Sequence, residues 1–223
     1  MVTREDDSEK ERDTDLCGDP KTCCEGKRWY PMRVTYSREL KVKGELDRLG
    51  IENFVPMTYK LVDAESENPR RELVPAVNNL IFVRSTRERL SSLKMTNAVL
   101  EPLRYMMDHT SDRVHEMMTV GDREMENFMR VAAMTDDSVM FLDEQSVVGK
   151  EGKRVMIMGG AFAGVEGVIR RVKRCKRVVV ELEGIVSVAI AYVPPVLLKE
   201  IKPVPCHLTE GINYEHRSNG LYG

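Results

Sequence analysis

Hydrophobic and polar positions alternate in a regular way from Trp29 onward. The run 29–36 is rich in aromatic and β-branched residues and predicts a strand. Ser37 then fits an N-cap, the spacing becomes helical from Arg38 to Leu49, and Gly50 fits the position after a helix end. The same reasoning predicts strands at 53–62, 73–84 and 99–107, and helices at 87–95 and from 121. The order β-α-β-β-α-β-α predicts an α+β fold, an α/β sandwich in which helices pack on a four-stranded antiparallel sheet.

Residues 152–202 have the pattern of a small all-β module. Strands are expected at 153–158, 165–172, 177–182, 185–192 and 196–201. The dipeptide Glu183-Gly184 separates two β-branched runs and predicts a hairpin turn. Five short strands in so short a segment are typical of a small barrel. We therefore expect a first domain at 28–134, a linker at 135–151 whose segment Val139–Leu142 docks back onto that domain, and a barrel at 152–202.

The two ends of the chain are polar and lack periodicity. We expect 1–27 and 203–223 to be disordered tails. Three thiols lie in the first tail, at Cys17, Cys23 and Cys24, and they are either free or part of a zinc site. The chain has five cysteines, an odd number at irregular spacing. This number argues against a secreted disulfide framework and favours a reducing cytoplasm.

Composition narrows the class of protein. Of 223 residues, 42% are hydrophobic and 31% charged, which is ordinary for a soluble globular protein. No apolar run is long enough to span a membrane, and the acidic N-terminus does not resemble a signal peptide. The net charge of −2 conceals +6 in residues 152–202. That excess either marks a surface for an anionic partner or is a solvated basic face.

The sequence offers no catalytic constellation. Its histidines lie in a predicted loop or in the C-terminal tail, without a nucleophile beside them. The glycine-rich stretch Gly159–Gly167 lacks the Gly-Lys-Ser/Thr of a phosphate-binding loop, and a strand rather than a helix follows it. We expect a strand-to-strand loop with positive φ angles and with Phe162 at its tip. The chain is predicted not to be an enzyme and to use no cofactor or metal.

Two segments resemble known modules. Gly152–Val168 matches the signature of a KOW domain. The first module resembles the N-terminal domain of the NusG family in Trp29-Tyr30, in Phe54–Pro56 and in Leu80–Arg84. The resemblance covers about residues 28–202, and two modules in this order are more specific than a KOW motif alone.

Finer details resemble the UpxY-type antiterminators of capsular polysaccharide operons. The resemblance lies in Arg177–Gly184 and in Ala189–Pro195. The chain departs from the family at Val77–Asn79, where a Phe-Pro-Gly-Tyr-type segment is usual.

The resemblance implies a contact with the clamp helices of the largest catalytic subunit of RNA polymerase. By position, Leu80 and Phe82 match the family's apolar contacts, supported by Trp29 and Pro56. Alternation puts Leu80 and Phe82 on one face of a strand and their two neighbours on the other. We expect Leu80 and Phe82 to be the exposed pair; the alternative is that Phe82 fills the core between sheet and helices.

Further contacts are implied by the same resemblance. Ser91 and Ser92 align with a motif that meets the polymerase gate loop, so that two contacts would bridge the cleft and reduce pausing. Arg38 and Lys41 match positions that meet the displaced non-template DNA strand; alternatively they belong to a solvated helix face.

The KOW module is implied to bind a ribosomal protein, a termination factor or nascent RNA. Phe162 matches a loop-tip residue used for protein partners. A basic hairpin could hold RNA phosphates through Arg170, Arg171, Lys173, Arg174, Lys176 and Arg177. Its β-branched strands favour a stable barrel over refolding into helices.

The leading functional hypothesis is therefore a monomeric, cytoplasmic transcription elongation and antitermination factor that raises polymerase processivity on a capsular or exopolysaccharide operon. A housekeeping NusG that couples polymerase to a ribosome or termination factor is one alternative. A KOW protein that binds RNA or the ribosome without contacting polymerase is another.

Overall fold

The computed structural model describes residues 26–62, 70–108, 116–135, 138–142, 147–148 and 152–201. Nearly all of both predicted tails, all four histidines and four of the five cysteines lie outside these described residues. The chain divides into two compact units. The first comprises Met1–Phe54 and Asn79–Val120, and the second comprises Val55–Asn78 and Gly121–Gly223.

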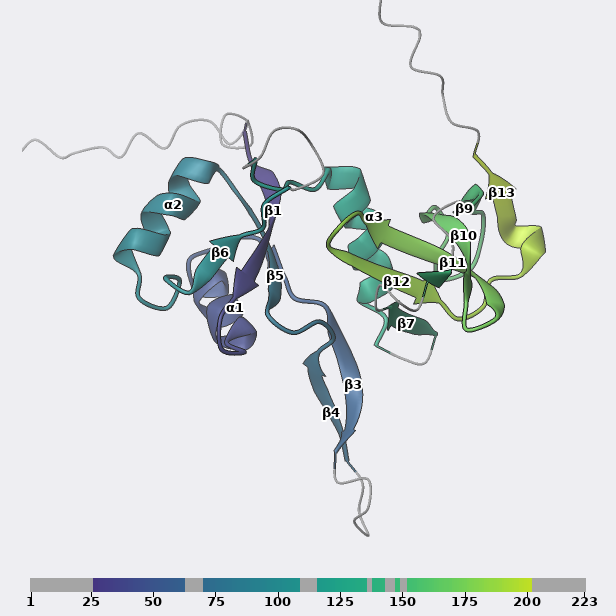
Figure 1. Ribbon diagram of the computed structural model, residues 1–223, viewed down its shortest axis with the longest axis horizontal. Coiled ribbons are helices and arrows are strands. Elements are labelled where there is room, and N and C mark those ends of the chain that lie inside the picture. The colour runs from purple at the N-terminus through teal and green to yellow at the C-terminus, as the bar shows by residue number, and fades with distance from the viewer. Residues whose placement is uncertain are drawn as a thin grey trace, which may run out of the picture. The chain divides into compact units, whose positions relative to one another are not determined.

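The first unit is built on a four-stranded antiparallel sheet (Figure 1). Its strands are β1 (Arg28–Val34), β2 (Asn53–Phe54), β5 (Leu80–Ser85) and β6 (Leu103–Tyr105), in the order β2-β5-β1-β6. The central pair is in register from Arg28 opposite Ser85 to Arg33 opposite Leu80. Residues that lie directly opposite in such a pair point to the same face, so this register decides which side chains share a surface.

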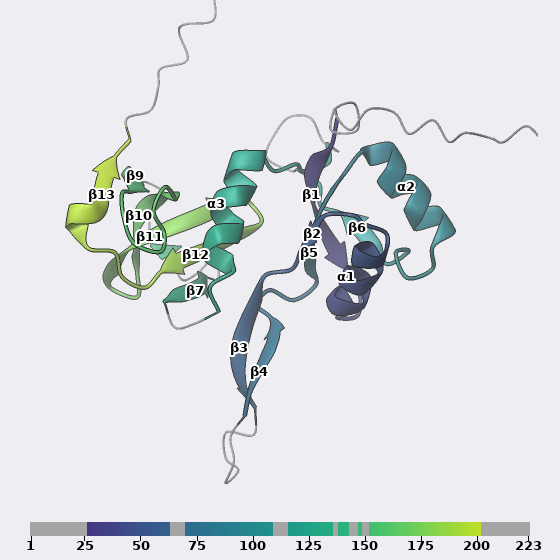
Figure 2. The ribbon, with the colours of Figure 1, turned by 180° about the vertical axis from the view of Figure 1, so that it is seen from behind.

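Two helices lie beside this sheet, α1 (Glu39–Arg48) and α2 (Arg87–Thr96), as Figures 1 and 2 show. On the face that α2 covers, the rings of Tyr30 and Tyr105 meet edge to face, with centroids 5.5 Å apart. The Ser91 hydroxyl of α2 lies 3.4 Å from the Tyr105 hydroxyl, and the Lys94 ammonium lies 4.7 Å from the centroid of the Tyr105 ring. Tyr30, Tyr105 and every second residue along their strands therefore form the inner face of the sheet.

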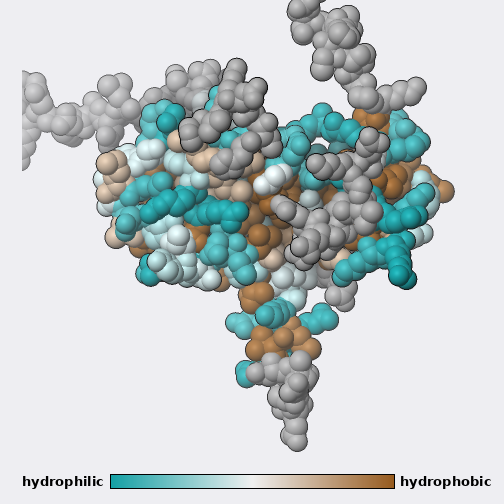
Figure 3. Space-filling view, viewed as in Figure 1, coloured by the Kyte–Doolittle hydropathy of each residue, from teal (hydrophilic) through white to brown (hydrophobic). Residues whose placement is uncertain are grey.

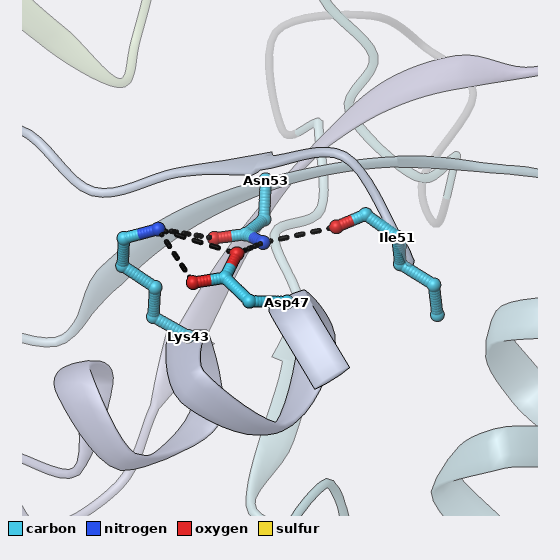
Figure 4. A network of polar contacts seen from close by, with 4 residues as sticks. All are labelled: Lys43, Asp47, Ile51 and Asn53. Atoms are coloured by element: carbon cyan, nitrogen blue, oxygen red, sulfur yellow. Dashed lines mark hydrogen bonds and ion pairs between the residues drawn. The ribbon is translucent and has the colours of Figure 1, made fainter. Parts of the chain in front are cut away.

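Helix α1 is attached to β2 by a polar network (Figure 4). The Asn53 side-chain amide donates to the Asp47 carboxylate at 2.7 Å and to the Ile51 carbonyl at 2.9 Å, while the Lys43 ammonium donates to Asp47 at 3.0 Å. The hydrogen bond from Asn53, followed by that from Lys43, lowers the pKa of Asp47. The network fixes the end of α1 against the edge of the sheet.

Two of the predicted strands are each divided in two. The expected strand 53–62 is interrupted at Val55-Pro56, because proline has no N–H to donate to a ladder. The expected strand 73–84 is interrupted at Asn79, whose φ is 62°. The outer halves, β3 (Met57–Val62) and β4 (Arg70–Pro75), pair only with each other among the described residues and form a two-stranded hairpin.

The prediction that Ser37 caps α1 is wrong. Ser37 has a φ of 49°, the cap position is Arg38, and no side chain there bonds to the helix. The cap predicted for α2 is confirmed, since the Thr86 hydroxyl accepts the Arg89 N–H at 3.3 Å. Gly50, with φ of 63°, follows α1 as expected.

The second unit contains a seven-stranded antiparallel sheet. The pairing order is β13-β9-β10-β11-β12-β7, and β8 also pairs with β10. The strands are β7 (Val139–Leu142), β8 (Val147–Val148), β9 (Arg154–Ile157), β10 (Glu166–Val172), β11 (Cys175–Leu182), β12 (Val186–Ile190) and β13 (Leu198–Glu200). Within the described ranges, the outermost strands β7 and β13 do not pair with each other. A mixed α/β chain with antiparallel sheets and a β-rich C-terminal region is thus confirmed.

The segment Val139–Leu142, which we expected to dock onto the first domain, belongs to the C-terminal sheet. It forms β7, which pairs with β12 in the register Val139 opposite Ile190 to Leu142 opposite Ser187. Leu142 also packs against a buried cluster of Val172, Val179 and Ala189. The apolar run is therefore an edge strand of the C-terminal sheet.

Helix α3 (Asp122–Ala132) packs on β11 and β12 within the second unit (Figure 1). Its buried residues Met125, Phe128, Val131 and Ala132 recur at helical spacing, as the sequence predicts. Its exposed side reaches the glycine-rich loop, because Arg130 donates to the Ala163 carbonyl at 2.6 Å. No helix among the described residues is long and apolar enough to cross a membrane.

Candidate functional surfaces

The first surface is the sheet face opposite α2. Strand register places Trp29, Leu80 and Phe82 together there: Pro31 lies opposite Phe82, and Leu80 lies opposite Arg33. Pro56, the fourth predicted contact residue, belongs to the second unit. The structure thus brings three of the four predicted residues onto one face.

The expectation that Leu80 and Phe82 are exposed is wrong. Leu80 is 4% exposed and Phe82 is fully buried, and the other two residues of this apolar run are fully buried as well. A strand buried on both faces has no exposed pair for alternation to reveal. Any partner that uses this face must reach side chains that are covered in the present structure.

The two residues that were predicted to contact the gate loop, Ser91 and Ser92, differ in their exposure on α2. Ser91 points to Tyr105 and is half-buried, whereas Ser92 is exposed. One turn further on, Met95 is 89% exposed. Residues three apart are neighbours on a helix surface, so Ser92 and Met95 lie side by side on the exposed surface of this helix.

The predicted DNA-contact residues Arg38 and Lys41 are both exposed, at the start of α1. The Arg38 guanidinium carbon lies 5.6 Å from the centroid of the Tyr36 ring. Sequence reasoning did not single out Tyr36, which is 82% exposed. Its signal in the sequence is an aromatic residue placed directly between a strand and a basic helix start.

The position of α1 relative to α2 is fixed by Glu45. Its carboxylate accepts hydrogen bonds from the Arg48 guanidinium at 2.6 Å and from the Asn97 side-chain amide at 2.6 Å. The bond from Arg48 and then that from Asn97 lower the pKa of Glu45 to about 2. Asn97 is the C-cap residue of α2, so the ionised carboxylate joins the two helices.

In the second unit, the glycine-rich loop takes the expected form. Gly160 and Gly164 have φ angles of 81° and 82°, as predicted for a loop that needs positive φ. The loop is closed by hydrogen bonds, including Gly164 N–H to the Ile157 carbonyl at 2.7 Å. Phe162 is half-buried at its tip, and Met158 at the start of the loop is 54% exposed.

The basic hairpin between β10 and β11 has two kinds of residue. Arg170 is bound to Glu181 at 2.6 Å, and Arg177 donates to the Ala191 carbonyl at 2.7 Å, so both hold the sheet together. The exposed members lie at and beside the turn, and they are Arg171, Lys173, Arg174 and Lys176. These four side chains form the part of the hairpin that an anion can approach.

A further surface escaped sequence reasoning. On the β3–β4 hairpin, Tyr59 lies opposite Leu73, and Leu61 is two residues along on the same face. These three side chains are 43% to 50% exposed, and apolar residues gather on the hairpin in Figure 3. Among the described residues, no group of three or more metal-binding side chains is present.

Comparison with known proteins finds a similarity to one family in the first part of the chain. Residues 27–129 match a family model described as "Transcription termination factor nusG". No curated protein matches the chain. Among solved structures, one described as "Domain interaction in Thermotoga maritima NusG" matches with a TM-score of 0.40 and 18% sequence identity, covering 80% of this chain and 99% of that one. The segment from β1 to most of α3, residues 27–129, is therefore similar to the NusG family.

Proposed function

We propose that this protein is a transcription elongation and antitermination factor that acts by binding RNA polymerase and not by catalysis. The observation that carries the proposal is the NusG-family match over residues 27–129. The proposal does not rest on an exposed apolar face, because Leu80 and Phe82 are buried. Its clamp-binding part requires that this face become accessible when the polymerase is bound.

In this proposal the N-terminal domain makes several contacts. The sheet face with Trp29, Leu80 and Phe82 binds the clamp helices, with Pro56 in support. The accessible side of α2, with Ser92, meets the gate loop. A factor that binds both sides of the cleft favours the closed clamp over the open one, and so reduces pausing.

The C-terminal module is proposed to be a KOW domain with a second partner. Its loop around Phe162 is the candidate site for a protein partner. The exposed bases of the β10–β11 turn are the candidate site for nascent RNA, through phosphate contacts. The UpxY-type specialisation for a capsular or exopolysaccharide operon is the finest part of the proposal and rests on sequence resemblance alone.

Co-sedimentation of the full chain with core RNA polymerase tests the proposal. We expect a stoichiometric complex, and no complex would refute polymerase binding and leave an RNA- or ribosome-binding role. The variant Met95→Asp changes an exposed side chain next to Ser92, so folding is preserved and a loss of antitermination points to α2. The matched control is Tyr192→Asp, since Tyr192 is a similarly exposed side chain (75%) of the second unit.

A transcription assay separates the specialised from the housekeeping form. Read-through is measured across all operons in a strain that lacks the gene. A loss of read-through that is confined to one polysaccharide operon supports the hypothesis of a specialised antiterminator. A uniform change in all operons supports a general NusG that couples polymerase to other machinery.

A further inference from the structure

The β3–β4 hairpin has an apolar face that no other strand covers in the described part of the chain. Its two strands pair only with each other there. Tyr59 lies opposite Leu73, and together with Leu61 they are 43% to 50% exposed. A two-stranded hairpin is only marginally stable in water, and three or more strands or a packed helix are needed for independent stability. The hairpin is therefore a surface that gains stability from an added strand.

The hydrogen-bond pattern shows which backbone groups of β3 face its free edge. The Ala76 N–H donates to the Pro56 carbonyl at 2.8 Å, and these two residues continue the β3–β4 register. Hydrogen-bonded pairs alternate with non-hydrogen-bonded pairs along an antiparallel ladder. Every second residue of β3 therefore bonds inward to β4, and the N–H and C=O groups of the others point outward. The outward residues of β3 are Met57, Tyr59 and Leu61.

The two free edges of the hairpin differ in their protection. By the same alternation, the outward residues of β4 are Arg71, Leu73 and Pro75. Proline has no N–H to donate, and proteins protect sheet edges with proline and charged residues. The outward residues of β3 include neither a proline nor a charge. The edge of β3 is thus the one that is open to a further strand.

Strand β3 is complementary to a second copy of itself. In an antiparallel pairing centred on Tyr59, Tyr59 lies opposite Tyr59 of the second copy, and Met57 lies opposite Leu61 of the second copy. These are hydrogen-bonded pairs, so every outward N–H and C=O of both strands gains a partner. Residues directly opposite each other point to the same face, and the apolar faces of both hairpins become one continuous stripe.

The charges of β3 favour this register over its neighbour. Lys60 lies opposite Glu72 in its own hairpin, and it would lie opposite the uncharged Thr58 of the second copy. A pairing centred one residue further on would place the two Lys60 side chains directly opposite each other, which is unfavourable. Charge complementarity therefore supports the pairing centred on Tyr59.

We propose that the chain self-associates through an antiparallel β3–β3 pairing centred on Tyr59, which joins two hairpins into one four-stranded sheet. The inference does not rest on the proposed function. The short strand and its half-exposed apolar side chains bury much less than the roughly 800 Å² per partner of a standard interface, so the Kd is on the order of 100 μM. The monomer expected from the sequence is the state at low concentration.

Sedimentation velocity of the full chain tests the proposal, from low to high micromolar concentration under reducing conditions. We expect the weight-average sedimentation coefficient to rise with concentration. Tyr59→Lys and Tyr59→Glu each place two like charges opposite each other at the centre of the pairing and should each abolish self-association. An equal mixture of these two variants should associate again, because opposite charges then meet.

Leu73→Lys is the matched control. Leu73 belongs to the same apolar face and is similarly exposed, but it lies on β4, away from the pairing edge. This variant should retain self-association. The fluorescence of Trp29, which is 2% exposed, checks that all three variants are folded.

A lysine-reactive crosslinker tests the register. In the proposed pairing the two Lys60 side chains are diagonal neighbours on one face, within reach of such a reagent. Trypsin does not cleave after a modified lysine, so Lys60 is carried on the peptide Leu49–Arg70, in which it is the only lysine. We expect this peptide to be joined to its own copy, which only two chains can produce.

Four results would overturn the proposal. They are a monomer at every concentration, self-association that persists in Tyr59→Lys, no recovery in the mixture, and an equal loss in Leu73→Lys and Tyr59→Lys. The first would leave the edge of β3 to an extended segment of another protein. The last would indicate stacking through the apolar face instead of pairing through the edge.

Discussion

Asn79 has two separable roles, and two substitutions distinguish them. Its φ of 62° suits asparagine or glycine, and its side chain accepts the Ser37 N–H. Asn79→Gly keeps the backbone and removes the hydrogen bond, at a cost of about 1 kcal/mol once the added freedom of the unfolded chain is included. Asn79→Ala removes the same bond and forces a Cβ-bearing residue into the left-handed region, which brings the total to roughly 2 kcal/mol.

The first unit carries its own reporter for this comparison. Trp29 is the single tryptophan of the chain and is 2% exposed in β1. Urea unfolding followed by its fluorescence should place the midpoint of Asn79→Ala below that of Asn79→Gly by about 0.5 M, for a denaturant slope near 2 kcal/mol/M. Coincident midpoints, or a more stable alanine variant, would refute the role assigned to the backbone conformation.

Three further predictions concern substitutions of single residues. Glu45→Gln should destabilise the chain most above pH 4.5, because the folded-state pKa of Glu45 is lowered to about 2. In unfolding titrations, the difference in the free energy of unfolding between the variant and the unsubstituted chain should vanish as the pH falls from 4.5 toward 2. Gly167→Ala places a Cβ 2.8 Å from both a Val178 methyl and the Val179 carbonyl, and should lower the stability of the second unit by about 1–3 kcal/mol in thermal unfolding; Gly44→Ala, with nothing within 4 Å, is the matched control and should not destabilise. Thr86→Ala removes the cap of α2 and should cost about 1 kcal/mol by circular dichroism melts; an unchanged melting temperature would contradict the capping bond.

Local patterns predicted the helices and most strands of the described chain. The apolar spacing of α3 and the cap and length of α2 depend on residues a few positions apart, and both were predicted close to their observed bounds. The division at Pro56 was missed because an apolar run continues across it, and the division at Asn79 was missed because the pattern does not reveal the positive φ of that residue. The first strand ends because Pro56 has no backbone N–H to donate, and the second is interrupted by the left-handed backbone conformation of Asn79.

Features that depend on distant residues could not be derived in the same way. Val139–Leu142 is an apolar run. The neighbouring sequence does not indicate that this run pairs with β12, nearly fifty residues further along the chain. The burial of Leu80 and Phe82 has the same origin, because alternation assigns faces and does not say what covers them. The presentation of Tyr36 depends on Asn79, which lies on another strand.

The placement of β1 has a consequence for biosynthesis. This strand leaves the ribosome first among the described elements, yet it is central in its sheet, between β5 and β6. Its residues Arg28 and Met32 cannot find their partners Ser85 and Tyr105 until those have been translated and have emerged from the exit tunnel. The strands β9 to β12 pair with their immediate successors and need no such delay. The N-terminal sheet therefore closes late in its own synthesis, and nascent chains arrested before Tyr105 should remain sensitive to protease in this region.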